Sequence, residues 1–211
     1  PKVIDFVLDY FAQIEEKLYF RGITEEVVDY LKEEYGDRFE YIAERDLFDY
    51  VYDGEIMRTL KGRKNSKKRN HINYFLTEYD GRFEYRLLGK EDFDDCRALL
   101  DEWTINKEEN DNIEEGVDDE RSGIEKLFTH YDQICDRLKI AGIYIDGKLE
   151  AFTMGELLNK NMALIHIEKA NPEIRGLYPY INQQFLVHEF PEVEFVNREE
   201  DMGIEGLRKA K

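Results

Sequence analysis

Residues 140–157 constrain the fold more than any other part of the chain. Ile140 to Ile145 and Lys148 to Leu157 are two runs rich in strand-forming residues, and only Asp146-Gly147 separates them. An Asp-Gly pair accepts the positive φ angles that a two-residue hairpin turn requires. The sequence therefore predicts two antiparallel strands joined by a tight turn, and any fold for this chain has to contain that pair.

The elements predicted around this hairpin follow a definite order. Apolar spacing and turn residues predict strands at 83–87, 162–168 and 193–197, and helices at 93–103, 124–135 and 180–190. The acidic stretch 107–119 is interpreted as a solvated loop, and 199–211 as charged and turn-rich. The order β-α-α-β-β-β-α-β resembles the GCN5-related acetyltransferase (GNAT) architecture. In that fold, the loop before the helix that follows the fourth strand binds the pyrophosphate of the acyl carrier.

The first 80 residues have a different rhythm. Helices are predicted at 2–14 and 24–36, and strands at 18–22, 39–43 and 48–52. This βαβ-like alternation predicts an α/β layer. A further helix follows, because Ile72, Phe75, Leu76 and Tyr79 form one apolar stripe.

The composition excludes several classes of protein. With 211 residues and 13% aromatic residues the chain has enough material for a folded core, despite 37% charged residues. No apolar run reaches the ~18–20 residues of a membrane span. Cys96 and Cys135 fall in helix patterns, which favours free thiols and a cytoplasmic protein. The two Cys and four His residues show no metal-ligand spacing, so we expect no metal.

A basic segment stands out in this acidic chain, whose formal net charge is −18. No acidic residue lies between Ile56 and Thr77, and the cations there are Arg58, Lys61, Arg63, Lys64, Lys67, Lys68 and Arg69. The other 23 of the 30 Lys and Arg residues face 48 Asp and Glu residues. Such concentrated charge creates a local field that attracts an anion, whereas the net charge argues against general nucleic-acid binding.

The position of this charge favours a phosphate site. Cations at a helix N-terminus oppose the helix dipole, unless an anion offsets them. We therefore interpret Lys61, Arg63, Lys64, Lys67, Lys68, Arg69, Asn70, His71 and Asn73 as candidate phosphate-binding residues. The alternative is a basic surface helix balanced by acidic neighbours.

The loop at Arg175-Gly176 is the second candidate. A basic residue followed by glycine lets backbone N–H groups approach a pyrophosphate. Tyr178, however, stands where the GNAT loop would carry a second small residue. The alternative is a structural turn between a strand and a helix.

Polar residues at two strands complete the candidates. His166 and Glu168 are predicted on one strand face with Leu164, about 7 Å apart, opposite Ile165 and Ile167. Either His166 or Glu168 could act as a general base, although a satisfied polar pair is the alternative. Asn197, Arg198 and Glu200 follow the last strand: the first two are candidate substrate-binding residues and Glu200 a third candidate catalytic residue. The carboxylates that end this run could also simply begin a solvated helix.

Three stretches together resemble one family. They are Lys61 to Asn73, the Gly176-Leu177-Tyr178 loop with Asn182-Gln183, and Asn197 to Gly203 with Gly206 to Lys211. They resemble uncharacterised bacterial proteins related to the C-terminal domain of phosphatidylglycerol lysyltransferase.

This resemblance implies two GNAT-like domains in tandem. Residues 1–80 would be part of the N-terminal domain with a basic connecting helix, and 81–211 a C-terminal domain without its last strands. About a third of the usual polypeptide would lie mainly before Pro1. Membrane enzymes of the wider group move an aminoacyl unit from tRNA to a lipid head group, whereas this chain is similar to stand-alone relatives without a membrane segment.

The sequence thus predicts a GNAT-like α/β (α+β) fold and an acyl- or aminoacyl-transferase-like protein. The donor would be a phosphate-bearing molecule, either acyl-CoA or the end of an aminoacyl-tRNA, and the acceptor an amine or a hydroxyl. The alternatives are a non-catalytic anion- or nucleotide-binding module with the same fold, and a purely structural domain.

Overall fold

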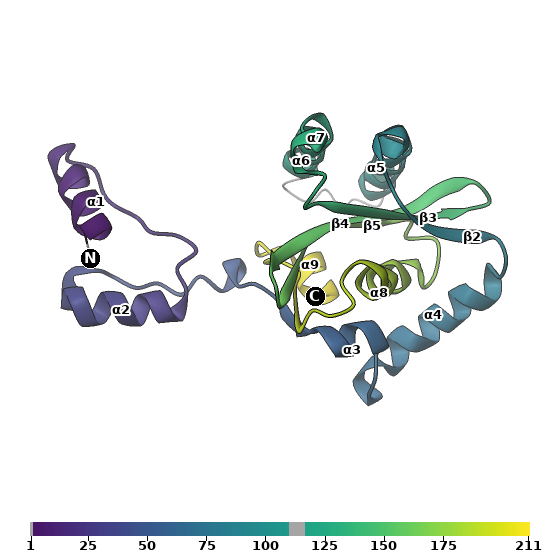
Figure 1. The fold of residues 1–211 in the computed structure, drawn as a ribbon, viewed down its shortest axis with the longest axis horizontal. Helices are drawn as coiled ribbons and strands as arrows, with labels where there is room; N and C mark the ends of the chain where they lie inside the picture. Colours follow the sequence, from purple (N-terminus) through teal and green to yellow (C-terminus); the bar gives the residue numbers. More distant parts are fainter. Residues whose placement is uncertain (1, 110–116) are drawn as a thin grey trace. The chain divides into compact units, whose positions relative to one another are not determined.

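The computed structural model describes residues 2–109 and 117–211, and the chain forms two compact units, Pro1–Phe48 and Asp49–Lys211. The first unit contains helices α1 (Lys2–Gln13) and α2 (Glu25–Tyr35) and the short 3₁₀ turns η1 (Gly36–Arg38) and η2 (Arg45–Leu47) (Figure 1). Both predicted helices are therefore present in this unit.

The strands predicted at 18–22 and 39–43 are wrong, and with them the βαβ-like rhythm of this unit. No strand forms between residues 2 and 48. The alternating aromatic residues pack against each other instead: the Phe39 ring lies 6.0 Å from that of Phe20 and 5.7 Å from that of Tyr35 on α2. A strand also needs a partner for its backbone groups, which this segment does not find.

The second unit is built on a six-stranded sheet with the order β1-β6-β5-β4-β3-β2. Its strands are β1 (Val51–Asp53), β2 (Phe83–Leu87), β3 (Lys139–Ile145), β4 (Lys148–Asn159), β5 (Met162–Ala170) and β6 (Phe195–Asn197). The β5–β6 pair is parallel and every other pair is antiparallel.

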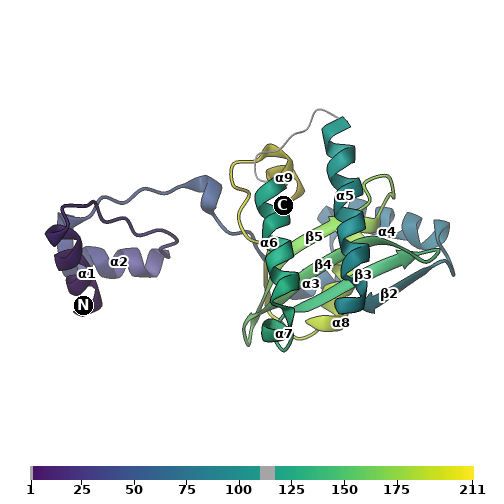
Figure 2. The same ribbon diagram turned by 90° about the horizontal axis from the view of Figure 1, so that it is seen from above.

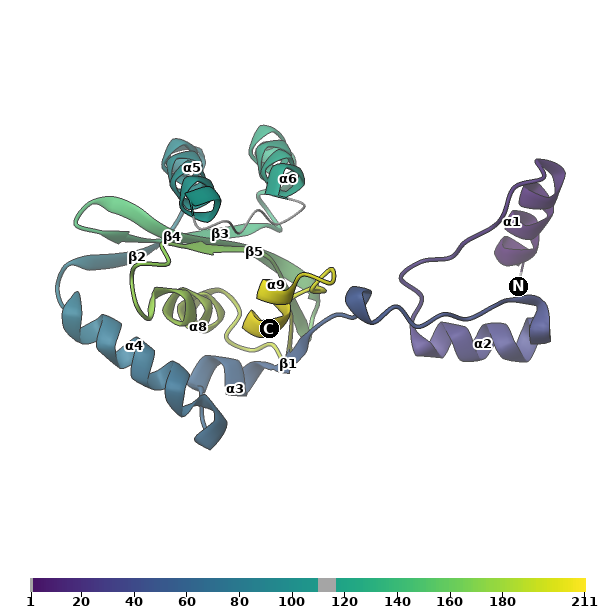
Figure 3. The ribbon, with the colours of Figure 1, turned by 180° about the vertical axis from the view of Figure 1, so that it is seen from behind.

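Helices cover both faces of this sheet. They are α3 (Gly54–Thr59), α4 (Ser66–Glu78), α5 (Phe93–Glu109), α6 (Val117–Thr129), α7 (Tyr131–Ile134), α8 (Leu177–Glu189) and α9 (Glu205–Ala210), with 3₁₀ turns η3 (Arg63–Asn65) and η4 (Lys90–Asp92). Helices α5 and α6 lie side by side on one face (Figures 1 and 2). Helix α8 covers the other face, with α3 and α4 packed against it (Figure 3).

The predicted order of elements from residue 83 onward is confirmed, and with it the GNAT-like α/β fold. The hairpin is also confirmed: Asp146 and Gly147 have φ angles of 51° and 85°, which is the positive pair that its turn requires. The segment between the two helices is shorter than the predicted acidic loop at 107–119, because α5 reaches Glu109 and α6 begins at Val117. Its centre, 110–116, lies outside the described residues.

The boundary between the two units lies after Phe48, whereas the sequence placed it at residue 80. The reason is that β1 pairs with β6, while the buried Ile72 and Phe75 of α4 join a core with Leu177 and Ile181 of α8. The predicted basic helix therefore belongs to the sheet domain. That residues 1–80 contain part of another GNAT-like domain stays a prediction.

Gly176, directly before α8, lies against the backbone of α4. It is buried, its φ is 92°, and a Cβ atom built there would lie 2.1 Å from the backbone oxygen of His71. Because His71 offers rigid backbone at this point, no side-chain rearrangement can make room. The glycine is thus explained by helix packing.

We expect Gly176→Ala to lower the free energy of unfolding by about 2–4 kcal/mol, since strain at positive φ adds to a steric clash. Gly147→Ala is the matched control, because Gly147 has a similar φ but open space around it, and we expect a loss of only about 1–2 kcal/mol there. Urea denaturation measures both. Equal losses would show that the contact with α4 contributes nothing.

Candidate functional site

The basic segment divides into three groups, and the first serves the fold itself. Arg58 donates from its guanidinium to the backbone oxygens of Phe190 (3.2 Å) and Val193 (2.9 Å). Lys61 forms an ion pair with Glu55 at 2.6 Å. Arg69 donates to the backbone oxygens of Leu60 and Gly62, which holds the turn before α4. These three cations therefore have local structural partners.

A second group faces outward. Arg63, Lys64 and Lys67 are exposed on η3 and the first turn of α4. Asn70 and Tyr74 follow Lys67 at helical spacing and are exposed as well. Arg175 lies over the Tyr74 ring, 4.8 Å from its centroid. The remaining candidates Asn73 and His71 are exposed and half-buried, respectively.

The third group is Lys68, which is exposed as well but lies near charged and polar side chains of β5, of α8 and of the segment after β6. Glu168 of β5 accepts hydrogen bonds from Asn182 of α8 (2.6 Å) and from Arg198 after β6 (3.2 Å). Burial and the nearby Arg198 lower the pKa of Lys68, while Glu168 opposes that effect. We call Lys68, Glu168, Asn182 and Arg198 the β5–β6 cluster.

The side chains of Glu168 and Arg198 are only 12% and 14% exposed, so their charges are largely removed from water. A further cation lies near: burial and Arg198 also lower the pKa of Lys211. Tyr52 of β1 interacts with Arg198 and donates its hydroxyl to the backbone oxygen of Lys211. The cluster thus contains one ion pair, Arg198 with Glu168, and two further cations, Lys68 and Lys211, lie near Arg198.

The strand order explains why these residues meet. The parallel pairing of β5 with β6 ends at Leu164 and Asn197, whereas β5 continues to Ala170. Glu168 lies on this unpaired extension, and Arg198 is the first residue after β6. In open α/β sheets the region beyond the carboxyl ends of neighbouring parallel strands is the usual place for a ligand.

His166 lies in a bulge of β5 and is separate from this cluster. Its Nδ1 is 2.8 Å from Glu199 and its Nε2 is 3.2 Å from Glu156 of β4. These hydrogen bonds, above all that with Glu199, raise the pKa of His166 against the effect of burial.

The predicted alternation along β5 is wrong. The register shifts opposite Met154 and Gly155, which pair with Ile167 and Ile165. As a result Ile165 packs in the core beneath α8 and Ile167 against the core beneath α5 and α6. A bulge adds one residue, so that the period-two pattern breaks at His166.

The space beside the Arg175-Gly176 loop is occupied by other parts of the protein. Gly176 lies against α4, as described above, and Tyr178 is half-buried. The Tyr178 hydroxyl accepts a hydrogen bond from Trp103 Nε1 at 3.0 Å and another from the Ala170 backbone. Tyr178 thereby covers the end of β5.

The run from Asn197 to Gly203 is held from several sides. Asn197 is buried and donates to Asp49 at 2.8 Å, and Glu199 N–H donates back to the Asn197 side chain at 2.7 Å. Asp201 is buried, and the hydrogen bonds from Arg208 and Tyr50 strongly lower its pKa. Glu200 is half-buried beside Lys211, which donates to the Glu200 backbone oxygen at 2.5 Å.

The carboxylates between Asn197 and Gly203 each face a different neighbouring residue. Within residues 2–109 and 117–211 no group of three or more His, Cys, Asp or Glu residues could hold a metal ion. Cys96 and Cys135 are both free thiols.

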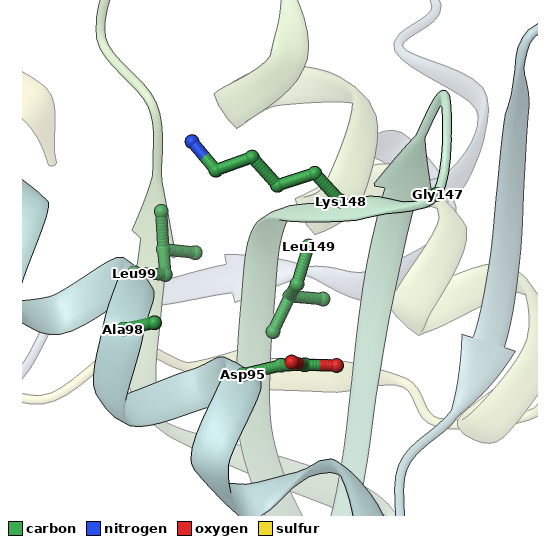
Figure 4. Close-up of a pocket in the computed structure, with 6 residues that line it drawn as sticks. All are labelled: Asp95, Ala98, Leu99, Gly147, Lys148 and Leu149. Carbon is green, nitrogen blue, oxygen red and sulfur yellow. The ribbon is translucent and has the colours of Figure 1, made fainter.

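A small pocket lies elsewhere, between α5 and the β3–β4 hairpin (Figure 4). Asp95, Ala98 and Leu99 line it from α5, and Gly147, Lys148 and Leu149 from the hairpin. Its volume of about 160 Å³ is below the ~300–1,000 Å³ typical of ligand sites. We therefore place the candidate site at the β5–β6 cluster.

Sequence reasoning missed Asn182, Lys211, Tyr52 and Glu156 as parts of these networks. Each becomes a neighbour only through the sheet order, since Asn182 contacts Glu168 across the β5–α8 connection and Glu156 contacts His166 across the β4–β5 pair. Asn182 and Lys211 lie in stretches that carry the family resemblance, but no local motif assigns a role to any of the four.

Comparison with known proteins places this geometry in a family. The family described as "Phosphatidylglycerol lysyltransferase, C-terminal" matches residues 1–211. The chain belongs to this family.

The chain is similar to the following three proteins. A crystal structure of a conserved protein of unknown function from Bacteroides thetaiotaomicron is 31% identical, with a TM-score of 0.90 over 99% of this chain and 69% of that one. An uncharacterized protein of Mycoplasmoides gallisepticum is 23% identical over 99% of this chain and 65% of its own length. The C-terminal domain of an Agrobacterium fabrum protein described as a "Putative Lysylphosphatidylglycerol Synthetase" is 16% identical, covering 72% of this chain and 45% of that chain, with a TM-score of 0.46.

The chain thus spans about two thirds of the length of the first two relatives. Family and fold together point to an acyltransferase-like domain. In the described part of the chain, no helix combines the length and the apolar character that crossing a bilayer requires.

We expect Arg198→Met to lower the free energy of unfolding by about 2–4 kcal/mol, because it leaves the Glu168 carboxylate buried without its ion-pair partner. Adding Glu168→Gln should recover at least half of that loss, because the unpaired charge is then removed. Urea denaturation of the single and double variants measures the coupling, with the exposed Lys67→Met as control. Purely additive losses would show that the two side chains are not coupled.

Proposed function

We propose that this chain is an acyl- or aminoacyl-transferase-like domain that holds a phosphate-bearing donor at the β5–β6 cluster. The observation that carries this proposal is the surplus of positive charge there: Lys68 and Arg198 lie near the single carboxylate of Glu168, which pairs with Arg198, beyond the end of a parallel strand pair. Because Arg198 lowers the pKa of Lys68, an anion bound beside both cations would stabilise their charges. The family match supports the same type of reaction.

The geometry favours an aminoacyl-tRNA end over acyl-CoA as the donor. A GNAT loop binds the pyrophosphate of CoA through exposed backbone N–H groups, but here Gly176 is packed on His71 and Tyr178 is held by Trp103. In contrast, Arg63 and Lys64 on η3 and Lys67 at the start of α4 are exposed, and all three directly precede Lys68 in the chain. A row of cations suits successive phosphates of a nucleic-acid strand, while the acidic remainder confines that contact to one place.

The transfer would be a direct attack by the acceptor. A neutral amine or a hydroxyl forms a bond to the acyl carbon, the ester bond of the donor breaks, and the leaving ribose oxygen takes up a proton while the acceptor loses one. His166 contacts carboxylates with both ring nitrogens, and both oxygens of Glu168 already accept hydrogen bonds. We therefore assign the role of base to Glu200, which lies half-buried beside the cluster.

A non-catalytic anion-binding module is the second candidate. The same observation favours it, because two of the three candidate bases are occupied by neighbouring side chains. In that case the anion site would be retained without transfer.

Binding of tRNA and CoA to the 211-residue chain tests the donor. We expect tRNA to bind more tightly than CoA, with an affinity that falls as salt rises. Changing Arg63, Lys64 and Lys67 together to Gln should reduce the salt slope by about 2. Lys61→Gln is the matched control, because Lys61 is paired with Glu55. Tighter binding of CoA, with no effect of the triple change, would contradict this assignment.

Transfer from aminoacyl-tRNA to an amine acceptor tests catalysis. We expect Glu200→Gln to slow transfer by roughly 100-fold or more with tRNA affinity unchanged, because proton removal is lost. Mass spectrometry of the acceptor gives the readout. If wild-type chain binds tRNA but modifies no acceptor, the binding-module candidate is correct instead.

A further inference from the structure

One side chain, His166, ties together three parts of the sheet domain. The ring belongs to β5, its Nε2 contacts Glu156 of β4, and its Nδ1 contacts Glu199 in the segment after β6. The three side chains are only 26–37% exposed. We call this arrangement the His166 clamp.

The contacts of the clamp determine the charge of the ring. An ionised carboxylate oxygen can only accept a hydrogen bond, and both ring nitrogens face such oxygens. Both nitrogens must therefore donate, which only the imidazolium form can do. The hydrogen bonds to these two carboxylates also raise the pKa of His166, in agreement with this geometry.

Glu199 is the part of the clamp that matters for the β5–β6 cluster. It directly follows Arg198, and its φ of 56° is an unfavourable angle for a residue with a side chain. On its other side, Tyr50, which directly precedes β1, binds the same two residues: Arg198 N–H donates to the Tyr50 oxygen (2.9 Å), and Tyr50 N–H to the Glu199 oxygen (3.1 Å). The segment is thus fixed between Tyr50 and the clamp.

We propose that His166 is a positioning residue, which holds Arg198 against Glu168 by fastening Glu199 to β4 and β5, and that anion binding at the cluster weakens when His166 loses its proton. The clamp itself does not depend on the proposed function, whereas its effect on a bound anion does.

The direction of the pH dependence follows from the surrounding charges. Glu156 faces the ring from β4, and Glu199 from the segment that also carries Arg198 and Glu200. Glu168 lies two residues along β5, and Lys211 approaches Glu199 from the end of α9. Because its partners are anions, the folded state favours charged His166. The clamp is therefore complete below the folded pKa of His166 and is lost as pH rises through it.

Hydrogen exchange of the full 211-residue chain tests the clamp without any ligand. At about pH 6, where the ring is charged, we expect His166→Gln to reduce protection of the Arg198 and Glu199 amides roughly fivefold. His166→Arg should keep wild-type protection, because it retains a cation between the two carboxylates. Glu199→Gln is a second, isosteric variant that should match His166→Gln. Wild-type protection in both Gln variants would overturn the proposal.

Sulfate binding measured by calorimetry tests the consequence for the cluster. Sulfate keeps its charge from about pH 6 to about pH 9, so a change in affinity reports on the protein. We expect affinity to fall across the His166 titration followed by NMR, and to show no such step in His166→Arg. A pH-independent wild-type affinity would overturn the pH dependence. If sulfate binds at neither pH, the proposed anion site is wrong, while hydrogen exchange still decides the clamp.

Discussion

The early end of the β5–β6 pairing is the constraint on which the rest of the site depends. β6 is three residues long, and β1 occupies its other edge, so that β6 is fixed from both sides. β5 runs six residues further than the last pair. Its extension carries Glu168 into a region where Asn182 and Arg198 can reach the carboxylate. A buried ion pair of this kind stabilises a fold only if its remaining hydrogen-bonding groups are satisfied, and Asn182 satisfies one of them.

The basic segment shows how one run of charge can serve several purposes. Arg58 and Arg69 donate hydrogen bonds to backbone oxygens outside the regular helices and strands. These hydrogen bonds explain the two side chains without a role for their charge in ligand binding. Lys68, only one residue from Arg69, instead faces the β5–β6 cluster. Helical geometry makes this division, because adjacent residues point about 100° apart around the axis. Charge density along a sequence therefore overestimates the size of the site that it forms.

The limits of prediction from sequence follow from the range of the signals. The hairpin at Asp146-Gly147 and the basic helix after Arg63 depend on neighbouring residues, and both were predicted. The strands predicted at 18–22 and 39–43 do not form. Alternation of apolar and polar residues indicates which side chains share a face, but not whether a partner strand exists. The bulge at His166 could not be predicted from the sequence either, because it arises from the register between β5 and β4. Asn182 and Glu156 enter their networks through contacts between elements, which no spacing rule contains.

The Gly176 loop shows why fold and reaction have to be argued separately. Its Arg-Gly sequence resembles a phosphate-binding turn, and its place before α8 is where the GNAT fold would put one. Yet the space that such a turn offers to a ligand is here filled by the backbone of α4 and by Tyr178. The same glycine that would admit a pyrophosphate admits a helix instead, because both need the absence of a Cβ atom. A fold can therefore keep its topology while this turn loses the room for a ligand, and function has to be argued from the side chains present and not from the fold.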